Sequence, residues 1–229
     1  KDVADSPLEL ITEFTPTQET PEAENPYDKK LPLILVVEDN DELRDYLCEN
    51  LVANYQVRQA SDGKQGLEKA LEVIPDLIIS DLSMPEMDGM SLCEAIKTNE
   101  KTSHIPFILL TAHHNQEARL AGLNVGADDY ITKPFNINLL EARVKNLVLS
   151  RKKLRENFSR NVYLKPSDIS LMPADEAFLA KVIGIIESRL ADSQFDVEQL
   201  ESALSMSKMQ LYRKLKSLTD LSGNDFIRQ

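Results

Sequence analysis

Residues 76–89 read DLIISDLSMPEMDG, and this stretch is the most informative one for the fold. An apolar run ends at Asp81, and a turn rich in Pro, Asp and Gly follows it. In open α/β sheets the ligand site lies outside the carboxyl ends of the strands, so a carboxylate at this position is a candidate site residue. The pattern predicts a buried strand over residues 76–80 with Asp81 at its carboxyl edge.

A short apolar strand followed by an amphipathic helix recurs along residues 31–150. Parallel strands need right-handed helical crossovers, so this repeat predicts a doubly wound parallel sheet with helices on both faces. Asn40, Ser61 and Asn136 are the expected helix N-caps. The predicted strands are 33–37, 55–60, 76–80, 106–110 and 127–131, and the predicted helices are 41–53, 63–73, 88–99, 115–123 and 136–150.

Length and composition describe an ordinary globular chain. Its 229 residues allow one or two domains, and 42% hydrophobic with 28% charged residues is typical of such proteins. No apolar run approaches the roughly 20 residues that span a bilayer, and no cleavable signal pattern is present, so we expect a cytoplasmic segment without membrane contact. The first residue is Lys1 rather than Met, which favours a piece of a longer chain. Cys48 and Cys93 lie among apolar residues of helical patterns, which favours core packing over a disulfide.

Charge and proline content divide the chain into segments. Of the net charge of −12, residues 31–150 carry −9, whereas residues 151–229 carry +2 and can approach a polyanion without strong repulsion. Residues 1–30 are proline-rich with little apolar periodicity, which predicts a linker. Residues 151–173 form a connector, whose basic cluster at 151–153 we interpret as a helix extension rather than a phosphate site. The remainder is predicted to be helical over 175–191, 196–204 and 208–219, with a further start near 223.

Polar side chains follow four of the predicted strands, and their chemistry suits a divalent metal. Mg²⁺ prefers a few carboxylates together with water and phosphate oxygens. Asp39 and Asp81 can supply direct oxygen ligands, and Glu38 can bind directly or through water. The backbone carbonyl of Ser83, two residues after Asp81, can supply another.

The same strand ends suit a phosphoryl group, whose transfer depends mainly on positioning and on cationic stabilisation. Asp81 is the best candidate nucleophile, and its attack on phosphorus would form an aspartyl phosphate. Lys133 can pair with phosphoryl oxygens, and the Thr111 hydroxyl can donate a hydrogen bond to one. A cis bond before Pro134 could aim the lysine, but cis bonds are uncommon even before proline, so spacing does not predict one.

These motifs together resemble those of response-regulator receiver domains. The resemblance covers about half of the chain and is carried by Val36-Val37-Glu38-Asp39-Asn40, Asp81 to Gly89, Thr111-Ala112 and Lys133-Pro134-Phe135. It implies a flavodoxin-like fold, a phosphoacceptor at Asp81, and a switch pair of Thr111 and Tyr130. It also implies a Mg²⁺ site of Glu38, Asp39, Asp81 and the Ser83 carbonyl. The implied phosphoryl donor is a histidine kinase, and a homodimer is compatible although no surface pattern selects its face.

The last third contains two short helical patterns separated by a tight turn. Asp196 and Ser207 are their expected N-caps, and the apolar positions can form one core. A basic second helix of this kind fits a helix-turn-helix, whose second helix enters the major groove of DNA. The expected core is Val197, Leu200, Leu204, Leu211, Leu215 and Leu218, with Lys208, Gln210, Arg213, Lys214 and Lys216 largely exposed. The candidate DNA contacts are Ser207, Lys208, Gln210, Arg213 and Lys214.

This region resembles the first half of an AraC-type DNA-binding domain, through residues 206–216 and 224–228. The connector resembles hybrid two-component regulators, in which sensor, kinase, receiver and AraC-type output share one chain; an inner-membrane anchor in such a parent is compatible with this. Asp220 stands where that family has a turn glycine, and Gly223 where proline is common. We therefore expect a small all-α segment at 174–229 with only the first helix-turn-helix, and hence weak DNA binding.

Two other functions stay open at this stage. An aspartate-dependent phosphatase would need a second acid two residues after the nucleophile, where Ser83 stands. A protein-interaction module would use the helical end without touching DNA. The histidines do not predict a zinc site, because His113 and His114 are adjacent and no Cys lies at ligand spacing.

Overall fold

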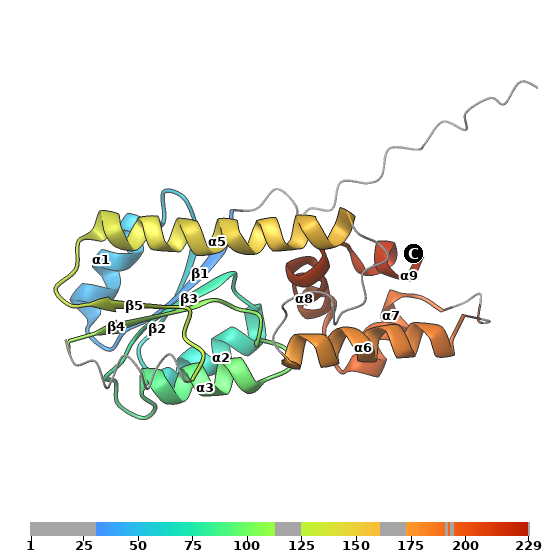
Figure 1. Ribbon diagram of the computed structural model, residues 1–229. Coiled ribbons are helices and arrows are strands. Elements are labelled where there is room, and N and C mark those ends of the chain that lie inside the picture. The colour runs from blue at the N-terminus through green and yellow to red at the C-terminus, as the bar shows by residue number, and fades with distance from the viewer. Residues whose placement is uncertain (1–30, 113–124, 161–172, 191, 193–194, 229) are drawn as a thin grey trace, which may run out of the picture. The chain divides into compact units, whose positions relative to one another are not determined.

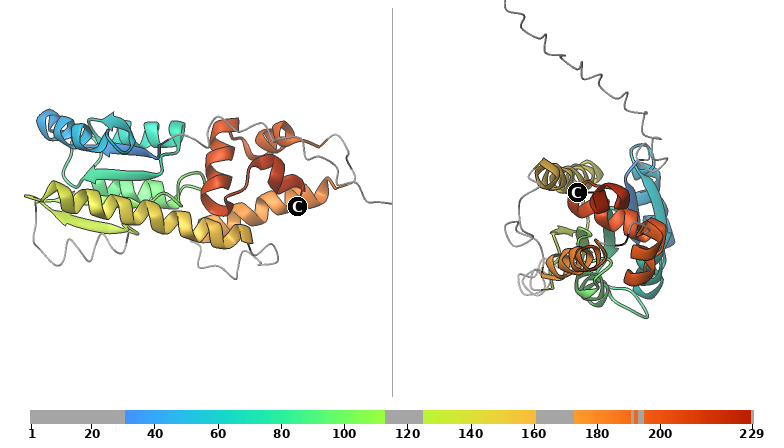
Figure 2. Two further views of the ribbon diagram at one scale, coloured as in Figure 1. Left: turned by 90° about the horizontal axis from the view of Figure 1, so that it is seen from above. Right: turned by 90° about the vertical axis from the view of Figure 1, so that its right-hand side faces the viewer.

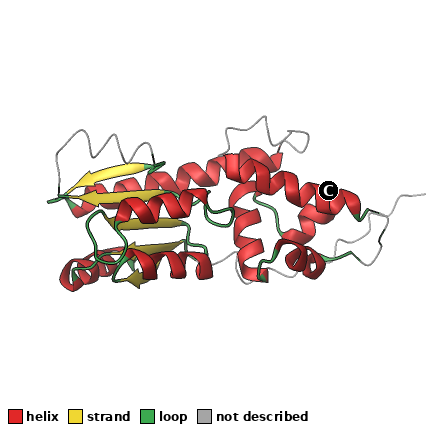
Figure 3. Cartoon of the chain, turned by 90° about the horizontal axis from the view of Figure 1, so that it is seen from below, coloured by secondary structure: helices red, strands yellow, loops and turns green. Residues whose placement is uncertain are grey.

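The fold is built on one parallel sheet (Figures 1 and 3). The computed structural model describes residues 31–112, 125–160, 173–190, 192 and 195–228, with the backbone alone for 154–160. The strands are β1 (Leu33–Val37), β2 (Gln56–Ala60), β3 (Leu77–Asp81), β4 (Phe107–Thr111) and β5 (Asp129–Thr132), in the order β2-β1-β3-β4-β5. This order and the parallel pairing confirm the predicted flavodoxin-like, five-stranded sheet.

The helices follow the predicted alternation with the strands. The helix predicted at 115–123, the linker at 1–30 and the two adjacent histidines, His113 and His114, lie outside the described residues. The described helices are α1 (Asp41–Leu51), α2 (Gly63–Val73), α3 (Gly89–Thr98), α5 (Ile137–Arg160), α6 (Pro173–Ser188), α7 (Val197–Leu204), α8 (Lys208–Thr219) and α9 (Gly223–Arg228).

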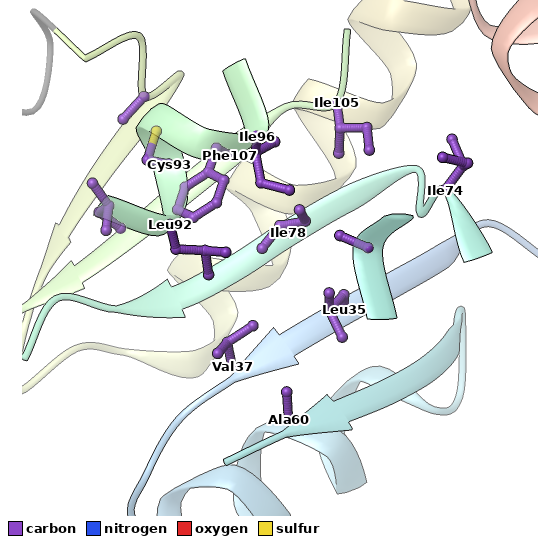
Figure 4. Close-up of a cluster of buried hydrophobic side chains, with 13 residues drawn as sticks. Leu35, Val37, Ala60, Ile74, Ile78, Leu92, Cys93, Ile96, Ile105 and Phe107 are labelled. Carbon is purple, nitrogen blue, oxygen red and sulfur yellow. The ribbon is translucent and has the colours of Figure 1, made fainter. Parts of the chain in front are cut away.

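Two apolar cores lie on opposite faces of the sheet, because successive side chains of a strand point to opposite sides. On one face Leu35 and Phe107 pack against Leu92 of α3, in a cluster to which α2 also contributes (Figure 4). On the other face Ile34 belongs to a cluster with α1 and α5 (Figure 2). The strands are therefore covered on both sides, as a parallel sheet requires. Cys48 and Cys93 are buried in these cores as free thiols, as predicted.

Side-chain caps set where the helices begin. The Asn40 side chain accepts a hydrogen bond from the Leu43 backbone N–H at 2.9 Å, which confirms it as the cap of α1. The predicted cap of α2, Ser61, is wrong. The helix begins at Gly63, so the residue directly before it, Asp62, is the cap. Asp88 caps α3 in the same way through the backbone N–H of Ser91.

Helix α5 continues past the sheet to Arg160. The basic cluster at 151–153 is therefore part of a helix extension, which confirms the interpretation from the sequence. Beyond it, α6, α7 and α8 share a third core, which contains Phe178, Leu200 and Leu215. The turn between α7 and α8 passes through Ser205 in the left-handed region. The Ser207 hydroxyl caps α8 by accepting from the Gln210 backbone N–H, and the Gln210 side chain accepts in return from the Ser207 backbone N–H.

One prediction for α8 is wrong. Lys214 was expected on the exposed surface, but its side chain is 0% exposed. The reason is helical geometry: Lys214 follows Leu211 by three residues and precedes Leu218 by four, so it lies on the same face as those two core residues. Helix α8 packs against α5 and α2 as well as against α7. The Lys214 ammonium group is surrounded by Asp175 and Phe178 of α6 and by Ser103 and His104.

Candidate functional site

The acidic residues at the strand ends meet at one edge of the sheet. Asp81 is the last residue of β3, and Glu38 and Asp39 directly follow β1, the neighbouring strand. One carboxylate oxygen from each of the three residues lies within 4.8 Å of the others. The sequence prediction that these acids converge is therefore confirmed.

Lys133 directly follows strand β5, and its side chain reaches this acidic cluster. Its Nζ lies 2.7 Å from Asp81 Oδ1 and 2.8 Å from Glu38 Oε2. Its backbone N–H donates to the carbonyl of Thr111 at 2.7 Å, which ties the segment after β5 to the end of β4. The Lys133–Pro134 peptide bond is cis, which spacing alone did not predict. One ammonium group thus bridges two carboxylates.

Burial sets the electrostatics of this site. Glu38 is 1% exposed and Asp81 is 8% exposed, whereas Asp39 lies open to solvent. Burial raises the pKa of Glu38, and this effect exceeds the lowering by its hydrogen bond with Lys133; the nearby Asp81 charge raises it further. Burial alone would lower the pKa of Lys133, but its hydrogen bonds to Asp81 and Glu38 outweigh that effect, so the net shift is upward. The buried site therefore favours an added positive charge.

The turn after β3 is tied back to the sheet. The Leu82 N–H donates to the Leu110 carbonyl at 2.8 Å, and the Gly89 N–H donates to the Leu82 carbonyl at 2.9 Å. A Cβ on Gly89 would lie 2.1 Å from the Asp81 carbonyl oxygen, so only glycine fits this close approach. Ser83 is exposed at the start of the turn, where its carbonyl remains a candidate ligand.

The two predicted switch residues occupy different surroundings. Thr111 is 2% exposed at the end of β4, the strand next to the one that ends at Asp81. Tyr130 lies on β5, partly buried against the core that includes α3. Its hydroxyl contacts the Met90 sulfur at 3.2 Å, and burial raises its pKa. In this structure the Tyr130 hydroxyl therefore contacts α3.

The donor set fits a hard divalent cation. Three carboxylates offer oxygen ligands, which Mg²⁺ prefers over nitrogen or sulfur ligands. His104 lies elsewhere, with its Nδ1 at 3.0 Å from Lys214 Nζ. Over the described residues, this acidic group is the one cluster of three or more possible metal ligands.

The five candidate DNA contacts are not equivalent in the structure. Ser207 and Lys208 are exposed at the start of α8. Gln210 and Arg213 are partly buried, and their side chains donate to backbone carbonyls at the end of α2. Lys214 is fully buried. The structure therefore leaves the first two open to a partner and engages the other three.

A buried polar cluster around Lys214 was not anticipated from the sequence. It joins Lys214 of α8 to Asp175 of α6 and to Ser103 and His104, which precede β4. All four residues are at most 5% exposed. The available signal was the apolar stripe of α8, in which Lys214 occupies a core position.

Comparison with known proteins agrees with this geometry. Residues 34–145 match the family described as response regulator receiver domain, and this part of the chain is such a domain. The match includes β1 from its second residue onward, the other four strands of the sheet and all residues of the acidic site.

Similar curated proteins include regulators and kinases. The chain is 40% identical over 202 residues to Histidine kinase P4 of Formosa agariphila, a match that covers 88% of this chain and 15% of that protein. It is 35% identical to the DNA-binding dual master transcriptional regulator RpaA of Synechocystis, over 62% of this chain and 60% of that regulator. The chain thus spans less than two thirds of either relative.

Solved structures show the same fold. A response regulator receiver domain protein from Clostridium thermocellum superposes with a TM-score of 0.51 at 28% identity, and covers 54% of this chain and 99% of its own. A response regulator of Chloroflexus aurantiacus gives a TM-score of 0.50 at 36% identity, over 52% and 99% of the two chains.

Among the described helices, none has the length and apolar character needed to cross a membrane.

Proposed function

We propose that this chain is the phosphoacceptor part of a hybrid two-component transcriptional regulator, in which Asp81 accepts a phosphoryl group from a histidine kinase. The observation that carries the proposal is the buried Asp81 carboxylate, paired at 2.7 Å with Lys133 and placed beside two further acids. The match of 88% of this chain to part of a histidine kinase supports a kinase in the same parent protein.

The chemistry follows from these side chains. A carboxylate oxygen of Asp81 attacks the phosphorus of a phosphohistidine, the P–N bond breaks, and the imidazole leaves with the bonding electron pair and takes up a proton. Lys133 moves its hydrogen bond from the carboxylate to a phosphoryl oxygen, and the Thr111 hydroxyl donates to another. The product is an acyl phosphate on Asp81, so the chain acts once per phosphorylation rather than turning over a substrate.

We assign a Mg²⁺ site to Glu38, Asp39, Asp81 and the Ser83 carbonyl. A bound Mg²⁺ would neutralise the negative charge gathered by the carboxylates and the incoming phosphoryl group. The burial of Glu38 and Asp81 beside each other supports this assignment, because the two carboxylates share one ammonium group. Asp39 is exposed and leaves the cluster accessible to an ion.

The output role is assigned to the helices at 174–229, as a partial AraC-type unit that follows the receiver domain at 31–150 and the connector at 151–173. Support comes from the α7–α8 pair, which has the short helices, the tight turn and the capped second helix of a helix-turn-helix. Ser207 and Lys208 remain exposed for a DNA phosphate.

Incubation with acetyl phosphate and MgCl₂ tests the phosphoacceptor role. The intact mass should increase by one phosphoryl group, and Asp81→Asn should abolish the increase. Asp45→Asn, which changes an exposed acid on α1, is the matched control and should be modified like the unaltered protein. Undiminished modification of Asp81→Asn would overturn the assignment.

One observation favours a second candidate function, a receiver-type interaction module without DNA binding. Gln210, Arg213 and Lys214 bind other parts of the same chain rather than solvent. In this alternative the helical end serves protein contacts alone. This alternative would be favoured if the affinity for a DNA duplex stayed unchanged when α8 is released from the receiver domain.

A further inference from the structure

A buried polar cluster connects the receiver domain to the helices that follow it. The Lys214 ammonium group lies 3.1 Å from Ser103 Oγ and 3.0 Å from His104 Nδ1, and pairs with Asp175 Oδ1. The Ser103 hydroxyl in turn donates to Asp175 Oδ1 at 2.7 Å. The Phe178 ring lies 5.3 Å from the ammonium nitrogen and completes its surroundings.

This cluster depends on the receiver domain for its hydrogen bonds. Removing a polar partner from a buried ion pair is costly, because the group that remains is left buried without compensation. Ser103 and His104 supply two of the three polar partners of Lys214, and both belong to the segment between α3 and β4. Without the receiver, Lys214 would keep only Asp175 among these partners.

Two more side chains of α8 bind the receiver. Gln210 Nε2 donates to the Leu71 carbonyl at 2.7 Å, and Arg213 Nη1 donates to the Ile74 carbonyl at 3.1 Å. These carbonyls lie at the end of α2, where a helix leaves backbone acceptors without internal partners and its dipole favours a cation. Both side chains therefore contact the C-terminal end of α2.

The same three side chains are candidate DNA contacts. Gln210 and Arg213 each donate a hydrogen bond to the receiver, which holds both side chains against the end of α2. Lys214 in addition is fully enclosed and has no path to a groove while α8 is docked. Docking on the receiver therefore competes with the use of Gln210 and Arg213 as DNA contacts.

We propose that the receiver surface formed by Leu71, Ile74, Ser103 and His104 is a docking site for α8, and that docking withholds Gln210 and Arg213 from nucleic acid. This inference rests on the proposed output role of α8, and it does not require Asp81 to be the phosphoacceptor. Ser207 and Lys208 stay outside the docking site.

Labelling of lysines with an amine-reactive reagent tests the docking in the 229-residue protein. Lys208 on the same helix is exposed and serves as the internal reference for Lys214. Lys214 should be labelled about 100-fold more slowly than Lys208, because reagent reaches it only when the docked state opens. Ser103→Ala removes one hydrogen-bond partner from the receiver side and should raise the Lys214 rate about tenfold.

The matched control is Ser91→Ala, which changes an exposed serine on α3 and should leave both rates unchanged. Ser103 lies outside the core of the C-terminal helices, so its truncation opens the docking site without removing a core residue of α6, α7 or α8. Equal labelling of Lys208 and Lys214 in the unaltered protein would overturn the proposal. An unchanged Lys214 rate in Ser103→Ala would do the same.

Binding to a random-sequence DNA duplex at low salt tests the withholding. Ser103→Ala should bind several-fold more tightly than the unaltered protein, and adding Arg213→Gln to it should cancel the gain. Equal affinities of the unaltered protein and Ser103→Ala would overturn the withholding. Because no phosphodonor is used, that result would leave the phosphoacceptor assignment of Asp81 intact.

Discussion

Lys133 bridges Asp81 and Glu38 with one ammonium group. Both carboxylates are buried, so this ammonium group is the positive charge that compensates them. Such an arrangement is both a structural and a chemical feature. Structurally, the lysine offsets repulsion between buried acids. Chemically, it is the group already positioned to meet a phosphoryl oxygen on Asp81.

Replacing Lys133 by Ala should therefore lower the free energy of unfolding. We expect a loss of about 2 kcal/mol in metal-free buffer, because the two carboxylates keep their burial and lose their cation. Addition of MgCl₂ should recover part of the loss, since a divalent ion supplies the missing charge. Urea unfolding with and without MgCl₂ measures both effects. Lys64→Ala, which removes an exposed lysine of α2, is the control. An equally large loss of unfolding free energy in that variant would contradict this explanation.

Cys93 gives a pH-dependent prediction. Burial raises its pKa to about 12 from an ordinary value of 9.0. The native thiol therefore keeps its proton when the unfolded one has lost it, and its contribution to stability is full below pH 9.0 and is lost as pH rises toward 12. The stability advantage of the unaltered protein over Cys93→Ala should shrink by about 2 kcal/mol between pH 8 and 10.5. Urea unfolding of both proteins at the two pH values measures this, and a constant difference would contradict it.

At the scale of elements, the start of α3 determines the geometry of the turn that carries the site. Gly89 is the first residue of α3, and a Cβ there would overlap the Asp81 carbonyl oxygen at 2.1 Å. Gly184 in α6 offers a matched contrast, because a Cβ at that position would meet nothing within 4 Å. The two glycines thus separate a steric requirement from helix propensity.

Gly89→Ala should lower the free energy of unfolding by about 3 kcal/mol, because the added methyl group forces the turn away from β3. Gly184→Ala should raise it by about 0.5–1 kcal/mol, because alanine favours a helix more than glycine does. Thermal or urea unfolding of both variants checks the opposite signs. Stabilisation by Gly89→Ala would show that the turn yields more easily than its contacts with the sheet indicate.

Element boundaries show what the sequence could predict. Strands β1, β3 and β4 are short, mainly apolar runs between polar turns, and such runs locate a buried strand well. The cap of α2 was misplaced by one residue because Ser61 and Asp62 are both good caps, and the local sequence does not choose between them. The burial of Lys214 was missed because a lysine was assumed to face solvent, although its spacing from Leu211 and Leu218 placed it in the core stripe.

The cluster around Lys214 depends on segments far apart in the sequence. Ser103 and Lys214 are separated by 111 residues, and their contact follows from how α8 packs on the receiver domain. Residue patterns within one element carry no information on such packing. The acidic site was predictable because parallel strands bring their carboxyl ends to one edge whatever the helices between them do.

At the scale of the molecule, strand β4 connects the phosphoacceptor site with the docking site of α8. The strand ends at Thr111 beside Asp81, and it begins three residues after His104. Lys97 fixes the entry to this strand, because its Nζ binds the Ile105 carbonyl at 2.8 Å and Asp128 Oδ2 at 2.6 Å. A rearrangement of Thr111 toward a phosphoryl group therefore acts on a strand whose other end carries the contacts of Lys214.

This connection predicts that phosphorylation loosens the docking of α8. Acetyl phosphate with MgCl₂ should raise the labelling rate of Lys214 relative to Lys208 about tenfold, because a coupling free energy of 1–3 kcal/mol is typical between linked sites. Asp81→Asn should show no response, and Thr111→Val should be phosphorylated with a much smaller response. The rates follow from mass spectrometry of the labelled peptides. If phosphorylated protein labels at the unphosphorylated rate while Ser103→Ala labels faster, then docking exists but Asp81 does not control it, and the signal must leave the receiver domain by another surface.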